Sequence, residues 1–271
     1  FSELNKTNNS PYYSAIIGAL TLYSNPIITF GFNNNILASK INNGLSLTKY
    51  DAALILFNDK IIAQDSYETL VAYFIIDFPD PRLKVFFELG TTDRWENIAD
   101  FLNYPDHGIG SIFGFRQYGI FNRENLIMGF EYARLVKSSY WDKRPTPHWF
   151  GNEIFDYSSY DGNRWAAHSG SDSDDFYLFF GYQGEDIAFI PSLNYERHGV
   201  LYRRPSEVKM EIRLDLRYNW KGYIFNIIFE REWLEHAGFT MNDWRIGNVL
   251  WFGIERDLSN MLSDKIRLIN K

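Results

Sequence analysis

The most regular pattern in the chain is an alternation of apolar and charged residues over 208–218. Every second side chain in this stretch is apolar, and each side chain between them carries a charge. Successive side chains of a β-strand point to opposite faces, so this period of two predicts a strand with one apolar and one charged face. The apolar row resumes over 223–229 after Lys221-Gly222, and the stretch 206–234 is therefore predicted to form an antiparallel hairpin.

Both arms of this hairpin are long, at about eleven to thirteen residues, whereas an average strand has about five or six. Tilted strands of about 9–11 residues are long enough to cross a bilayer. In hydrocarbon every backbone N–H and C=O must be hydrogen-bonded within the protein, so long alternating hairpins in series predict a barrel. A long sheet of a soluble β-sandwich or lectin is the alternative interpretation.

The same kind of pattern recurs along the chain and predicts about eleven strands in all. The predicted strands are 12–23, 27–34, 68–77, 82–91, 109–118, 124–136, 174–182, 187–196, 206–220, 223–234 and 247–257. Short helices are predicted at 46–57 and 96–102, both within long connections. Short and long connections alternate, as in bacterial outer-membrane barrels, which have short periplasmic turns and long extracellular loops.

We therefore predict an all-β fold, with residues 1–271 forming a single domain that is a transmembrane antiparallel outer-membrane β-barrel. Short helices would lie in its extracellular loops, and 258–271 would be a C-terminal periplasmic tail. An odd strand count with a periplasmic C-terminus places 1–11 outside, whereas such barrels ordinarily have an even count and both ends in the periplasm. The chain is thus expected to be the C-terminal part of a larger barrel, lacking its N-terminal strands and unable to close on itself.

Composition fits a bacterial outer-membrane location. The 271 residues include 18 Tyr, 23 Phe and 8 Trp, and the mean hydropathy is nevertheless slightly negative at -0.30. This combination suits a protein with an apolar outer band and a polar interior. The net charge of -7 argues against a nucleic-acid partner, and the absence of cysteine excludes disulfides and thiolate metal sites.

The long connections carry the candidate binding residues, because polar and aromatic loop residues on a rigid scaffold commonly form binding sites. All five histidines are predicted to lie there, together with five of the tryptophans: His107, His148, His168, His198, His236, Trp95, Trp141, Trp149, Trp165 and Trp244. An aromatic ring can cover the apolar face of a sugar while neighbouring polar groups form directional hydrogen bonds. The alternative is that these rings pack the loops together or form an aromatic girdle at the membrane surface.

Other charged groups are assigned structural roles. The charged row of 209–217, with Glu230 and Glu232 opposite, predicts a network of compensating ion pairs that narrows the lumen, and an ion path is the alternative. The acidic stretch 168–175 offers oxygen ligands but lacks the spacing of an EF-hand, so no metal or cofactor is predicted. Glu88 and Glu131 have no accompanying acid–base motif, and we predict that the protein is not an enzyme.

The order of several short motifs between about residues 13 and 175 resembles the capsule assembly protein Wzi family, particularly its Bacteroidota-type members. A strand ends in Glu-Leu-Gly-x-x-Asp, an Asp-Phe pair and a Pro-Asp-His segment follow, and an Arg-Pro-Thr-Pro-x-Trp segment lies in the longest loop. These motifs are Glu88-Leu89-Gly90 with Asp93, Asp100-Phe101, Pro105-Asp106-His107, Gly114-Phe115, Glu131, and Arg144-Pro145-Thr146-Pro147 with Trp149.

The resemblance implies an outer-membrane barrel of about eighteen strands that acts as a surface lectin-like anchor for capsular or exopolysaccharide. The expected partners are surface polysaccharide, outer-membrane lipid, and other envelope proteins or the N-terminal part of the same barrel. A porin or transport channel, or a structural subunit of an outer-membrane assembly, is the alternative. The candidate carbohydrate-binding residues, all in 92–107 and 137–172, are Trp95, Asp106, Trp141, Arg144, His148, Trp149, Arg164 and Trp165.

Overall fold

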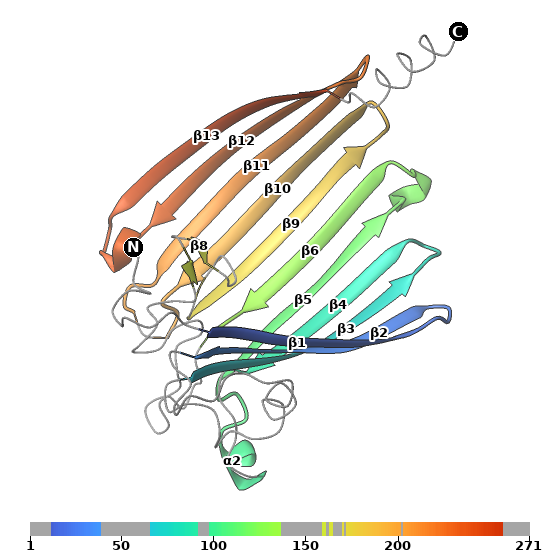
Figure 1. Ribbon diagram of the computed structural model, residues 1–271. Coiled ribbons are helices and arrows are strands. Elements are labelled where there is room, and N and C mark those ends of the chain that lie inside the picture. Colours follow the sequence, from blue (N-terminus) through green and yellow to red (C-terminus); the bar gives the residue numbers. More distant parts are fainter. Residues whose placement is uncertain are drawn as a thin grey trace.

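The computed structural model describes residues 12–38, 66–91, 98–136, 159–160, 163–164, 170, 172–201 and 203–256. These residues form one sheet of eleven antiparallel strands and a separate two-stranded hairpin, β7–β8 (Figure 1). The large sheet follows the chain order without a crossover, because each strand pairs with the strands before and after it and only the small hairpin is skipped.

The strands of the large sheet are 9 to 14 residues long, as a membrane-crossing strand requires. They are β1 (Tyr12–Leu22), β2 (Ile27–Ala38), β3 (Ser66–Phe78), β4 (Leu83–Thr91), β5 (Ile109–Tyr118), β6 (Leu126–Arg134), β9 (Ser173–Gln183), β10 (Ile187–His198), β11 (Glu207–Trp220), β12 (Tyr223–Glu235) and β13 (Trp244–Arg256). The remaining elements are α2 (Ile98–Asn103), β7 (Ser159–Tyr160), β8 (Asn163–Arg164) and the 3-10 turns η3 (Ile120–Asn122) and η4 (Ala237–Phe239).

The predicted all-β fold, its eleven strands and their antiparallel order are confirmed. Two details of the prediction are wrong, since His198 and Trp244 belong to strands β10 and β13 and not to long connections. The helix predicted at 96–102 is α2, whereas the one predicted at 46–57 lies outside the described residues. The β7–β8 hairpin was not predicted, because two-residue strands are too short to show an alternation.

The sheet curves but stays open in the part of the chain that the structure describes, with β1 and β13 at its two edges (Figure 1). The prediction that this chain does not close on itself is thus confirmed. An odd number of antiparallel strands makes β1 and β13 run in the same direction, so closure between them would require a parallel pair. Outer-membrane barrels close with antiparallel pairs instead.

All tight turns lie at one end of the sheet, and α2 and the strand ends that the long connections join lie at the other (Figure 1). The tightest turn is Lys221-Gly222 between β11 and β12, with φ angles of 50° and 78°. Two successive positive φ values are the signature of a type I′ turn, whose twist matches that of the flanking strands. The register of the longest hairpin is therefore fixed by its turn as well as by its alternation.

One face of the sheet is mainly apolar in all eleven strands, with Arg231 and Asn248 among its exceptions, and we call it the apolar face. A single row of directly paired residues runs from β1 to β13 on this face, and every member is apolar or aromatic. The row is Leu20, Phe30, Phe74, Phe87, Phe113, Tyr132, Phe176, Tyr195, Met210, Trp233 and Ile246. Most of these large side chains are exposed. The order of polarity is thus opposite to that of a soluble sheet, which buries its apolar face.

The other face, which we call the polar face, carries a neighbouring row of quite different character. That row is Thr21, Thr29, Ile75, Phe86, Gly114, Glu131, Tyr177, Asn194, Glu211, Glu232 and Gly247. Polar side chains on this face are buried in β9 and β10, where Glu196 is only 1% exposed and Asn194 only 9%. Among the helices that the structure describes, none is both long and apolar enough to span a membrane.

Candidate functional site

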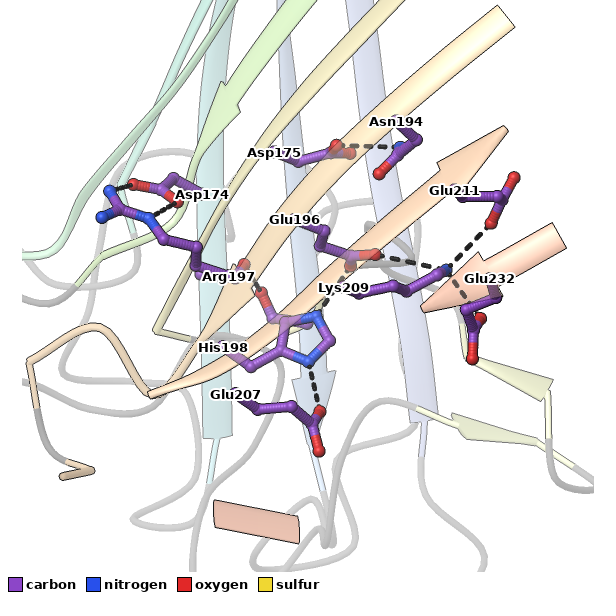
Figure 2. A network of polar contacts seen from close by, with 12 residues as sticks. Asp174, Asp175, Asn194, Glu196, Arg197, His198, Glu207, Lys209, Glu211 and Glu232 are labelled. Carbon is purple, nitrogen blue, oxygen red and sulfur yellow. Dashed lines mark hydrogen bonds and ion pairs between the residues drawn. The ribbon is translucent and has the colours of Figure 1, made fainter. Parts of the chain in front are cut away.

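A cluster of charged side chains lies on the polar face at the long-loop end of β9–β12 (Figure 2). The antiparallel register builds it from the end of β10 and the start of β11, where Glu196 is opposite Lys209 and His198 is opposite Glu207. Because these residues alternate along their strands, all four side chains point to the same face. We refer to these four residues, with Glu211 and Glu232, as the polar cluster.

His198 links the two strands through both nitrogens of its ring. Nδ1 lies 3.0 Å from Oε1 of Glu207, and Nε2 lies 2.8 Å from Oε1 of Glu196. Burial by itself lowers the pKa of His198, but the hydrogen bonds and charges of these two glutamates outweigh it and raise the pKa above its ordinary value. His198 stands beyond Tyr195, the last apolar-face ring of β10, and so lies outside the apolar band.

Lys209 is surrounded by three carboxylates. Its Nζ lies 3.3 Å from Glu211, 3.4 Å from Glu196 and 3.7 Å from Glu232. Glu196 therefore contacts both His198 and Lys209, which explains how a carboxylate can be almost completely buried. The six side chains of the polar cluster form one connected set of contacts (Figure 2).

Further along β11, Arg213 forms a second group of ion pairs. Its guanidinium lies 3.0 Å from Asp215 of the same strand and 3.6 Å from Glu230, its register partner on β12. The predicted network of compensating pairs on the 209–217 row is therefore confirmed for Lys209 and Arg213. Whether these pairs narrow a lumen stays a prediction, since the sheet is open.

The polar cluster is also tied to the connections at this end. The second oxygen of Glu207 accepts a hydrogen bond from the backbone N–H of Gly238 in η4, at 2.6 Å. Asp172 accepts hydrogen bonds from the backbone N–H of Leu201 at 3.2 Å on each oxygen. Through Glu207 the cluster therefore holds the β12–β13 connection, and Asp172, which precedes β9 and is not part of the cluster, holds the β10–β11 connection.

The acidic stretch 168–175 has structural partners in the residues that the structure describes. Both oxygens of Asp174 accept hydrogen bonds from Arg197, and Asp175 accepts one from the side-chain amide of Asn194 at 2.9 Å. Within the described ranges no group of three or more His, Asp or Glu side chains could hold a metal ion. Asp174 and Asp175 lie in β9, and these contacts tie them to β10.

Glu88 and Glu131 both lie on the polar face, on β4 and β6 with β5 between them. Glu88 is opposite Ile112, and Glu131 is opposite Gly114. The ring of Phe86 covers Gly114, where a Cβ would come within 2.4 Å of it. The two carboxylates belong to strands about 9–10 Å apart, and nothing in their contacts assigns a reaction to them.

Of the candidate carbohydrate-binding residues, Asp106 has a described side chain. It lies in the turn after α2, where its carbonyl accepts a hydrogen bond from Ile109, and this turn is at the long-loop end. Arg164 is the last residue of β8, and its side chain is not described. Six candidates lie outside the described residues: Trp95, Trp141, Arg144, His148, Trp149 and Trp165.

The contribution of β10 to the polar cluster was not predicted from the sequence. Its signal was present, because Ser192, Asn194, Glu196 and His198 are polar at every second position while Leu193 and Tyr195 alternate with them. The strand was ended at 196, so His198 was assigned to a loop. Comparisons of the chain with protein-family models, with curated proteins and with solved structures found no match.

Proposed function

We propose that this chain forms part of the wall of a bacterial outer-membrane β-barrel that holds surface polysaccharide at its long-loop end. The observation that carries the proposal is the unbroken apolar row that crosses all eleven strands. A soluble protein rarely exposes a contiguous apolar patch of more than a few hundred Å², and a lipid bilayer is the environment in which such a face is stable.

The residues at the tight-turn end support membrane placement. Trp220 and Tyr223 lie on the apolar face next to the β11–β12 turn, with Lys221 5.0 Å from the Trp220 ring and Arg256 4.8 Å from the Tyr223 ring. Aromatic rings with nearby cations are typical of the level of the lipid headgroups. At the tight-turn end the apolar face is therefore bordered by aromatic rings and cations, as a membrane-facing surface would be.

The long-loop end supports the binding part of the proposal. The strand ends that the long connections join lie there, as the polar cluster does, and bacterial barrels present their long loops to the outside. The connections 92–107 and 137–172 contain Trp95, Trp141, Trp149 and Trp165 together with Asp, Arg and His. These are the residue types that bind sugar rings, and the motif order resembling the Wzi family points to capsular or exopolysaccharide as the ligand.

The experiment is to replace Trp149 or Trp165 by alanine and to measure how much polysaccharide stays on the cell surface. We expect each variant to insert in the outer membrane but to release polysaccharide. The loss of one ring should weaken the binding free energy by roughly 0.5–1.5 kcal/mol. Trp220→Ala is the matched control, since Trp220 lies at the opposite end and its loss should affect insertion or stability and not retention. Equal retention in all three inserted variants would refute the proposal.

A transport channel is the second candidate, and the continuous row of charged residues on β11, with Glu230 and Glu232 of β12 opposite, favours it. If the polar face lines an open water path, the purified protein should give stable single-channel conductance in planar lipid bilayers. Arg213→Gln, which removes an ion pair from that row, should then change the conductance or the ion selectivity. Absence of conductance together with polysaccharide release in the Trp149→Ala variant would leave the anchor as the better description.

A further inference from the structure

A row of charged residues lies on the apolar face, immediately beyond the aromatic residues Tyr132, Phe176 and Tyr195 of the apolar row. Arg134 of β6 is opposite Asp174 of β9, and Asp174 is opposite Arg197 of β10. Each is two residues from an aromatic member of the apolar row, so all three point to the apolar face. They stand at the long-loop end of their strands.

Two of these three residues form a fixed pair. The Asp174 side chain is only 5% exposed, and its two oxygens accept hydrogen bonds from Nε of Arg197 at 2.8 Å and from Nη2. A carboxylate that receives both hydrogen bonds of a guanidinium fork holds that guanidinium in one orientation. The Arg197 side chain is nevertheless 41% exposed, and the guanidinium has further N–H groups that Asp174 does not use.

Arg134 supplies the second, open guanidinium. It is exposed and forms no ion pair with any residue that the structure describes. The row of two arginines and one aspartate therefore has a net charge of +1. The two arginine backbones are two strand spacings apart, roughly 10 Å, which lets both long side chains reach one anionic group.

The surface below this row is aromatic and then apolar. The rings of Tyr132, Phe176 and Tyr195 form a continuous strip, with centroids 4.4 Å apart for Tyr132–Phe176 and 6.5 Å for Phe176–Tyr195. Phe130 and Leu178, which are opposite each other, continue the apolar surface towards the tight-turn end. A ligand that fits the whole surface carries an anionic head and long apolar chains.

We propose that Arg134 and Arg197, the latter positioned by Asp174, bind a phosphate of an outer-leaflet glycolipid whose acyl chains lie along the apolar face below. Guanidinium groups pair with phosphate through parallel hydrogen bonds, and a phosphate neutralises the excess charge of the row. A lipid, unlike a free phosphate, also covers the aromatic strip and the apolar surface. The inference rests on the membrane placement proposed above but is independent of polysaccharide binding.

The test measures binding of bis-phosphorylated lipid A to the purified protein in detergent micelles, by native mass spectrometry or by displacement of a fluorescent lipid. Arg134→Gln is expected to weaken binding about tenfold or more, and Arg134→Lys to restore part of it, because lysine keeps the charge but not the fork. Arg197→Gln combined with Asp174→Asn, which leaves no unpaired buried charge, should have a similar effect. Arg256→Gln is the matched control, since Arg256 lies on the apolar face at the opposite end.

Two further probes identify the source of the phosphate. Lipid A without its phosphates should bind weakly and equally to the wild type and to Arg134→Gln, and inorganic phosphate should not compete at millimolar concentration. Equal lipid A binding by wild type and Arg134→Gln, an equal loss in Arg256→Gln, or effective competition by inorganic phosphate would overturn the proposal. Failure of the protein to insert in vesicles would instead refute the membrane placement, and unchanged polysaccharide retention in Arg134→Gln is expected.

Discussion

His198 is the residue of the polar cluster with the most direct consequence for stability. Its ring joins Glu196 of its own strand to Glu207 of β11, and Glu207 in turn holds the η4 turn through the N–H of Gly238. Polar groups of the neighbouring strands at this level include Lys209 of β11 and, on β9, Ser173 opposite His198 and Asp175 opposite Glu196. A proton on His198 therefore strengthens contacts among three elements.

We expect the stability of the protein to depend on pH through His198. A group whose pKa is higher in the folded than in the unfolded protein contributes its full stabilisation below the unfolded value and loses it as the pH rises through the folded value. The free energy of unfolding should thus decrease from about pH 6.5, the ordinary histidine value, upwards. Urea titrations in detergent at several pH values measure this, and His198→Gln should remove that part of the dependence. Identical pH profiles for the wild type and His198→Gln would contradict this prediction.

Leu214 tests the assignment of faces at a single position. It lies on the apolar face opposite Phe229, well inside the apolar band. In a membrane Leu214→Arg should reduce the free energy of unfolding by about 2–4 kcal/mol, because a charge placed near the bilayer midplane is costly. Ile228→Arg is the control, since Ile228 lies on the polar face opposite Asp215 and its arginine gains a partner. Unfolding titrations in lipid vesicles that find equal losses would argue against the membrane placement.

At the scale of elements, the sequence predicted the strands well where the alternation was complete. The charged row of β11 and the apolar row of β12 placed their side chains on the correct faces. The start of β13 was placed three residues late because Asn248 interrupts the apolar row that Trp244 and Ile246 begin. The candidate site was less predictable, because the partners of Lys209 come from β10, β11 and β12. The pairing register between these strands decides which side chains come into contact, and the sequence alone does not give it.

The β11–β12 turn gives a prediction about the backbone alone. Gly222 has a φ of 78°, and a Cβ added there would meet nothing within 4 Å. Gly222→Ala should therefore cost about 1–2 kcal/mol through its left-handed conformation and not through a clash. Gly247→Ala is the matched control, because Gly247 lies in extended β13 and its Cβ would make an ordinary contact with Glu232. Equal unfolding midpoints for the two variants would show that the turn carries no such strain.

At the scale of the whole molecule, eleven strands place an unbroken apolar row on one face, whereas the row on the other face is mostly polar from Glu131 of β6 onwards. The register rather than any single strand makes the surface continuous, because a slip of one residue in one pair would move polar groups onto the apolar face. Cation–aromatic pairs occur towards both ends of this surface, and the Arg134–Asp174–Arg197 row is found at the long-loop end. A sheet with these two faces suits a wall that separates lipid from water.

The absence of natural cysteine allows this wall to be mapped by single cysteines along β13. Leu250 and Phe252 lie on the apolar face, at 75% and 58% exposure, whereas Val249, at 51%, lies on the polar face. Because all three side chains are exposed, accessibility to a label does not depend on unfolding. In vesicles a dye at Leu250→Cys or Phe252→Cys should be quenched by lipid-attached quenchers, and one at Val249→Cys by aqueous iodide instead. Reaction of all three positions with a water-soluble maleimide at the same rate would show that neither face contacts lipid.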